Sequence, residues 1–137
     1  FFSPNLTIRQ FGYGCPISDA IRRGEEKCRK CGECFRENRN PERGFAEKAL
    51  AYTEELLGQG TVELLVLDEI SHALRHKLID LTRVETMIRN RPSGVSMVLT
   101  GRQMPDSLLN LADRVTACRV VKHPIAAGID ARRGSEY

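Results

Sequence analysis

The chain has 137 residues, of which 41% are apolar and 28% charged, and its formal net charge is +3. This length suits one domain with a buried core, and no apolar run approaches the roughly 20 residues that span a bilayer. The small net charge gives no reason to expect nucleic acid, although it is compatible with an anionic ligand such as a triphosphate. We therefore expect neither a membrane nor a nucleic-acid partner.

In chain order, the first predicted element is a strand at 5–12, where apolar and polar residues alternate. The stretch at about 22–44 is crowded with charges and lacks apolar periodicity, so it predicts a loop or an insertion. Helical spacing of apolar residues begins at Phe45, and we expect Gly58 and Gly60 to end that helix.

The second half of the chain continues the alternation of strands and helices. The predicted elements are a buried strand at 61–68, a helix at 80–91, a strand at 95–101, a short helix at 105–113 and a last strand at 115–123. This order predicts a single α/β domain over 1–137, in which helices cover the faces of a parallel sheet. The continuous apolar runs at 64–67 and 97–99 suit interior strands that are buried on both faces.

Polar residues follow three of the predicted strands, and ligands of open parallel sheets bind outside the carboxyl ends of the strands. The three segments are Asp68-Glu69, Thr100-Gly101-Arg102 and Lys122-His123. An aspartate at the end of a buried strand can hold magnesium, while the next carboxylate can polarise a water or orient a neighbour. The alternative is that the aspartate caps the following turn and that the glutamate is solvated.

Other side chains near these segments have two interpretations each. Arg102 could clamp phosphate oxygens in a bidentate way, or could pair with Asp106 at the surface. His72 and His76 have the spacing of a helical metal-binding pair, but no third ligand is in view. His123 could be a ligand or proton carrier, or could be satisfied structurally.

The sequence contains five cysteines, and an odd number without a secretory leader argues against a disulfide framework. We expect a cytoplasmic protein with reduced thiols. The spacing Cys28-x2-Cys31-x2-Cys34 can wrap a loop around a metal centre, and Cys15 could supply a fourth thiolate. Four thiolates suit an iron–sulfur cluster of the 4Fe–4S type or a structural zinc; the alternative is a loop of free, redox-sensitive thiols. Cys118 falls on a predicted strand, as a small core residue.

The ordered motifs "LLVLDE", "VLTGR", "LAD", "VT", "KHP", "GI" and "ARRG" resemble those of the P-loop-type ATP:corrinoid adenosyltransferases. The resemblance covers most of 8–14 and 45–137. It implies a RecA-like α/β fold of the P-loop NTPase type, Mg-ATP and a corrinoid as ligands, and a homodimer in the cytoplasm. It also implies that Asp68 and Glu69 hold or orient magnesium and that Arg102 lies near the phosphates, while Lys122 and His123 fall in a matching motif.

The implied reaction transfers the 5′-deoxyadenosyl group of ATP to a reduced cobalt(I) corrinoid and releases triphosphate. Cobalt(I) is the nucleophile, so the protein would contribute positioning and neutralisation of the leaving group. An iron–sulfur centre near the corrinoid would make chemical sense, and an electron-donating flavoprotein or ferredoxin is a further partner to expect.

One departure from the family is large, because the sequence contains no G-x-x-x-x-G-K-S/T motif. The family's first strand and glycine-rich loop would precede Phe1, so we expect residues 1–137 alone to be inactive. Two alternatives therefore stay open. One is a relative without a P-loop that acts as a corrinoid-binding or metal- and redox-sensing module, and the other is a different P-loop ATPase.

Overall fold

The computed structural model describes residues 4–15, 17–27 and 33–129. Its helices and strands are α1 (Ser18–Arg23), α2 (Glu33–Arg39), the 3-10 helix η1 (Pro41–Arg43), α3 (Phe45–Gln59), β1 (Leu64–Leu67), α4 (Ile70–Arg75), α5 (Leu81–Arg89), β2 (Ser96–Leu99), α6 (Asp106–Leu111) and the 3-10 helix η2 (Pro124–Ala127). Within these ranges no helix is both long enough and apolar enough to cross a membrane.

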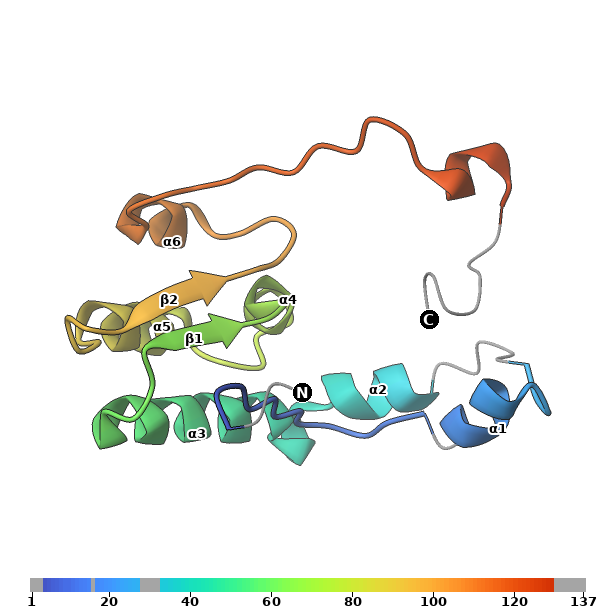
Figure 1. Ribbon diagram of the computed structural model, residues 1–137, viewed down its shortest axis with the longest axis horizontal. Coiled ribbons are helices and arrows are strands. Elements are labelled where there is room, and N and C mark those ends of the chain that lie inside the picture. The colour runs from blue at the N-terminus through green and yellow to red at the C-terminus, as the bar shows by residue number, and fades with distance from the viewer. Residues whose placement is uncertain (1–3, 16, 28–32, 130–137) are drawn as a thin grey trace.

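Strands β1 and β2 form a parallel pair, with Leu64 opposite Ser96 and Leu67 opposite Leu99 (Figure 1). The connection between them contains α4 and α5, as parallel neighbours require a long crossover. The predicted parallel α/β arrangement is thus confirmed for this pair. Because both strands point the same way, the residues that follow them lie at one edge of the sheet.

The core lies between one face of the strand pair and the helices. It is built from Leu50, Leu57, Leu65, Ile70, Ile79, Val84, Met87, Ile88, Val95 and Leu108. Successive strand residues point to opposite faces, and only the face that carries Leu65 is covered in the described part of the chain. Leu64 is 58% exposed and Val66 53% exposed, so the expectation that these strands are buried on both faces is wrong for the described residues.

Two predicted strands are absent from the described residues. The segment 5–12 forms no ladder; it lies along α3, where the Phe11 ring is 5.7 Å from that of Tyr52. The segment 115–123 is extended but unpaired, and Val121 is 90% exposed (Figure 1). An alternating pattern becomes a strand only when a neighbour supplies hydrogen bonds and an apolar layer. Cys118 is accordingly exposed rather than a core residue.

Within the stretch at 22–44, where we predicted a loop or an insertion, the described residues 33–43 contain α2 and η1. Asn38 holds α2 against the preceding segment, because its side chain accepts from the Tyr13 N–H at 2.7 Å and donates to the Tyr13 carbonyl at 2.9 Å.

The short helices α1 and α4 were also not predicted. Six or seven residues are too few for an apolar period to stand out, so these helices depend on tertiary contacts.

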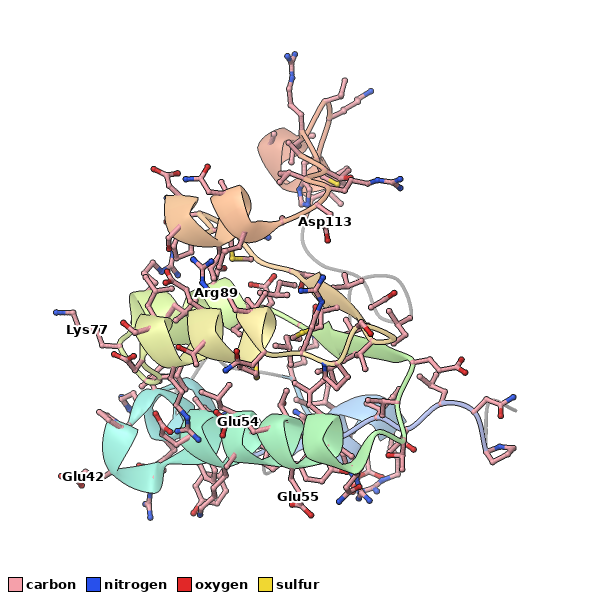
Figure 2. All side chains as sticks on the ribbon, turned by 90° about the vertical axis from the view of Figure 1, so that its left-hand side faces the viewer. Glu42, Glu54, Glu55, Lys77, Arg89 and Asp113 are labelled. Atoms are coloured by element: carbon pink, nitrogen blue, oxygen red, sulfur yellow. The ribbon has the colours of Figure 1, made fainter. Side chains whose placement is uncertain are left out.

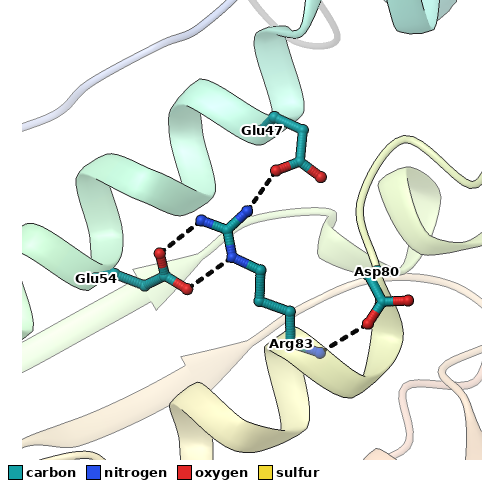
Figure 3. A network of polar contacts seen from close by, with 4 residues as sticks. All are labelled: Glu47, Glu54, Asp80 and Arg83. Carbon is teal, nitrogen blue, oxygen red and sulfur yellow. Dashed lines mark hydrogen bonds and ion pairs between the residues drawn. The ribbon is translucent and has the colours of Figure 1, made fainter.

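The three predicted helices are confirmed as α3, α5 and α6. Helices α5 and α6 are one or two residues shorter at each end than predicted, whereas α3 begins at Phe45 as predicted and continues through Gly58, so that only Gly60 ends it. Asp80 caps the amino end of α5, because its carboxylate accepts the Arg83 N–H at 2.9 Å. The Arg83 guanidinium then reaches α3, donating to both carboxylate oxygens of Glu54 at 2.9 and 2.6 Å and to Glu47 at 2.5 Å (Figure 3). These bonds join α3 to α5 alongside the apolar contacts.

We expect Glu54→Gln to lower the free energy of unfolding at neutral pH by at most about 1 kcal/mol, because both partners of the ion pair are more than one third exposed. The hydrogen bond from Arg83 lowers the pKa of Glu54. Its contribution is therefore present above the ordinary carboxylate pKa and is lost as pH falls through the lower folded value. Urea denaturation should show a smaller difference from the wild type at about pH 3 than at pH 7.

Glu55→Gln is the matched control. Glu55 is the next residue on α3, but Figure 2 shows its side chain pointing away from α5, whereas Glu54 points toward it. Its carboxylate accepts a bond from Gln59 on the same helix at 3.0 Å. Equal effects of the two substitutions would show that the bond between the helices does not contribute to stability.

Candidate functional site

The polar residues after β1 and β2 meet at the shared edge of the sheet. The Thr100 hydroxyl donates to Asp68 Oδ1 at 2.6 Å and accepts from the backbone N–H of Glu69 at 2.9 Å. The Thr100 N–H also donates to the Leu67 carbonyl at 3.1 Å, which extends the ladder to this point. The aspartate is thus held by the neighbouring strand rather than by the turn that follows it.

The turn after β1 is unusually sharp. Glu69 has φ of 54°, a left-handed conformation that is uncommon outside glycine, and α4 begins at the next residue. Glu69 occupies the N-cap position without making a side-chain cap bond, so the capping interpretation of Asp68 is not observed. The Glu69 side chain is exposed, as the alternative expected, but it also lines a pocket.

The loop after β2 is docked onto α4 through Ser71, which is only 2% exposed. The Ser71 hydroxyl donates to the Arg102 carbonyl at 2.9 Å. Gly101 has φ of 148°, and a Cβ added there would overlap Ser71 Oγ and lie 2.6 Å from Ser71 Cβ. Ser71 was not predicted as a site residue. The only sign of it in the sequence is that a small polar residue stands three positions after Asp68, the aspartate at the end of the strand.

A polar pocket of about 250 Å³ opens at this edge, lined by Glu69, Ser71, His72, Arg75 and Arg102. Arg102 lines this pocket, and no ion pair joins it to Asp106 among the described residues. Burial, followed by the nearby charges of His76, Arg39 and Arg75, lowers the pKa of His72. His72 is therefore neutral at pH 7, and its ring can accept a hydrogen bond.

His72 and His76 lie close together, with ring centroids 4.4 Å apart. However, no group of three or more histidine, cysteine, aspartate or glutamate side chains gathers in the described ranges. No such group therefore adds a third ligand to this pair within the described ranges. Nothing in this part of the chain favours a transition-metal site at these histidines.

Lys122 and His123 are not brought to this site in the structure. They lie at the exposed end of the segment 115–123, which Figure 1 shows running from α6 to η2. Of the seven residues predicted at the ends of strands, five lie at this edge of the sheet: Asp68, Glu69, Thr100, Gly101 and Arg102. The remaining two would need the last predicted strand to form.

The predicted cysteine cluster is not tested by these contacts. Cys28 and Cys31 lie outside the described residues, and Cys34 belongs to α2. Cys15 is a half-buried free thiol. Metal binding by these four cysteines therefore stays a prediction.

Residues 16–137 match the family of the ATP:corrinoid adenosyltransferases BtuR/CobO/CobP. This chain belongs to that family. It is 40% identical over 92 residues to the corrinoid adenosyltransferase of Pseudomonas aeruginosa, covering 67% of this chain and 45% of the relative. It is 37% identical over 94 residues to that of a Sinorhizobium species, covering 68% and 44%. The Escherichia coli K12 corrinoid adenosyltransferase is 27% identical over 101 residues, covering 74% and 52%. The chain spans about half the length of these curated relatives.

Proposed function

We propose that this chain forms part of the site that transfers the 5′-deoxyadenosyl group of ATP to a reduced cobalt(I) corrinoid. The observation that carries the proposal is the bond between Asp68 and Thr100, with Glu69 and Arg102 lining a pocket at the same edge of the sheet, in a member of this family. Cobalt(I) would attack the 5′ carbon with its electron pair. The bond from that carbon to the phosphate oxygen would break, and triphosphate would leave with the bonding electrons.

The residues at the sheet edge fit magnesium, which prefers oxygen ligands. Asp68 would hold the ion, and the hydroxyl of Thr100 keeps that carboxylate in place. When bound, magnesium would neutralise part of the charge of the leaving triphosphate. Glu69 would orient a water of the site, and Arg102 would contact phosphate oxygens. The close approach of the backbone at Gly101 would leave room for the nucleotide beside Thr100.

Several wider expectations belong to the same proposal. The parallel pair would be part of a RecA-like sheet of the P-loop NTPase type, and the protein would act as a cytoplasmic homodimer that receives electrons from a flavoprotein or ferredoxin. Pairing of the segment 115–123 as a further strand would carry Lys122 and His123 to the edge where Asp68 lies. These residues would then contact phosphate or a corrinoid side chain.

The reaction can be tested with the gene product that contains this chain, Mg-ATP and a chemically reduced corrinoid. We expect one triphosphate to be released for each cobalt–carbon bond formed, measured by phosphate analysis and by the visible spectrum of the corrinoid. Release of ADP and phosphate without adenosylation would indicate a different P-loop ATPase. Corrinoid binding without ATP turnover would indicate a binding module.

We further propose that Cys15, Cys28, Cys31 and Cys34 bind a 4Fe–4S cluster, because their spacing suits thiolate ligation. Protein purified without oxygen should contain iron and labile sulfide, and Cys31→Ser should remove both. One zinc ion per chain without sulfide would assign a structural zinc site instead. Absence of both metals would leave a loop of free thiols and contradict the proposal.

A further inference from the structure

We infer that Arg75 is an additional substrate-binding residue, which with Arg102 binds an oxyanion group of a substrate in the pocket at the sheet edge. The inference rests on the proposed function and adds a residue to its site. Arg75 ends α4, and Arg102 lies in the loop after β2, so the two guanidinium groups come from different elements. Both line the same pocket of about 250 Å³.

The hydrogen bonds of Arg75 position its guanidinium without neutralising it. Its Nη1 donates to Gln103 Oε1 at 3.1 Å, and its Nη2 lies 3.4 Å from His72 Nδ1. Neither acceptor is a carboxylate, so neither bond neutralises the charge of the guanidinium. A guanidinium has five N–H donors, so three remain without an acceptor among the described residues.

This arrangement differs from that of the arginines that stabilise the fold. Arg23, Arg43 and Arg83 each bind a glutamate carboxylate at 2.9 Å or less. Arg75 instead has neutral partners, one of which, Gln103, adopts a left-handed backbone with φ of 58°. That conformation is unfavourable for a non-glycine residue, and the Gln103 amide that follows from it accepts a bond from Arg75.

The chemistry of the pocket identifies the class of ligand. Two guanidinium groups outweigh the carboxylate of Glu69 and present planar sets of donors that match carboxylate or phosphate oxygens. The pocket is smaller than the roughly 300–1,000 Å³ of sites for drug-sized ligands, so it would take one anionic group rather than a whole substrate. The substrates of the proposed reaction offer two sources: the triphosphate chain of ATP and the acidic side chains of a corrinoid.

Arg75→Gln in the full gene product tests the inference by calorimetry with two probes. Loss of a charged hydrogen bond should weaken binding by about tenfold or more. Weaker binding of inorganic triphosphate would identify the phosphate chain as the ligand. Weaker binding of a corrinoid with free carboxylates, but not of its fully amidated form, would identify a corrinoid side chain. Arg75→Lys should recover part of the affinity, because it keeps the charge but not the planar donors.

Arg89→Gln is the charge-matched control. Arg89 is exposed in the last turn of α5, which leads to the amino end of β2, opposite the pocket. The Arg89→Gln variant should bind both probes with the affinity of the wild type. Thermal unfolding should show that all variants are folded. Less than a twofold change in Arg75→Gln for both probes overturns the inference. If adenosyl transfer persists in that case, the proposed function still stands; if the wild type itself transfers no adenosyl group, the proposed function fails independently.

Discussion

Asp68→Asn should lower kcat/KM for adenosyl transfer by about 100-fold or more, because a metal-bound charge in such a site contributes several kcal/mol. Asparagine retains the shape of the side chain and can still accept the hydrogen bond from Thr100, which is 2.6 Å long in the structure. The substitution therefore removes the charge while leaving the strand edge in place. The rate should be measured at several magnesium concentrations, and the loss should be partly offset at the highest ones.

Glu63→Gln is the matched control for this experiment. Glu63 is an exposed carboxylate at the other end of the same strand, next to the first residue of β1. Its replacement changes the net charge by the same amount but lies away from the carboxyl edge. We expect its kcat/KM to stay within about twofold of the wild type, in line with a surface substitution. Equal losses in the two variants would mean that Asp68 acts only through the overall charge.

Gly101→Ala should destabilise the protein by about 1–3 kcal/mol and also lower the transfer rate. With φ at 148°, position 101 lies where side chains are strained, and the new Cβ would collide with Ser71. Relief of that collision would move the loop off α4 and break the bond from Ser71 to the Arg102 carbonyl. Urea denaturation measures the stability, and the KM for ATP reports the displacement of Arg102.

Gly58→Ala provides the control for adding a methyl group. Gly58 lies inside α3, and a Cβ there meets no atom within 4 Å. Alanine favours a helix over glycine by about 1 kcal/mol, so this variant should be as stable as the wild type or more stable. A Gly101→Ala protein that unfolds at the same urea concentration as Gly58→Ala would contradict the docking of the loop onto α4.

The sequence was sufficient to predict the features that depend on local pattern. Apolar spacing and end signals predicted α3 and α5, and the apolar runs before Asp68 and Thr100 predicted two parallel strands with polar residues at one edge. These predictions succeed because apolar periodicity, helix caps and strand ends depend on residues that lie close together in the sequence. The motif order was likewise enough to indicate the family that the comparisons confirm.

Contacts between residues that are far apart in the sequence could be identified only from the tertiary structure. The fit of Gly101 against Ser71 joins α4 to a loop about thirty residues further along the chain, and the fold places Arg75 and Arg102 in one pocket. The segment 115–123 was predicted as a strand, but it pairs with no other strand in the described part of the chain. Pairing and packing are decided by which surfaces meet in space, and a local sequence pattern does not contain that information.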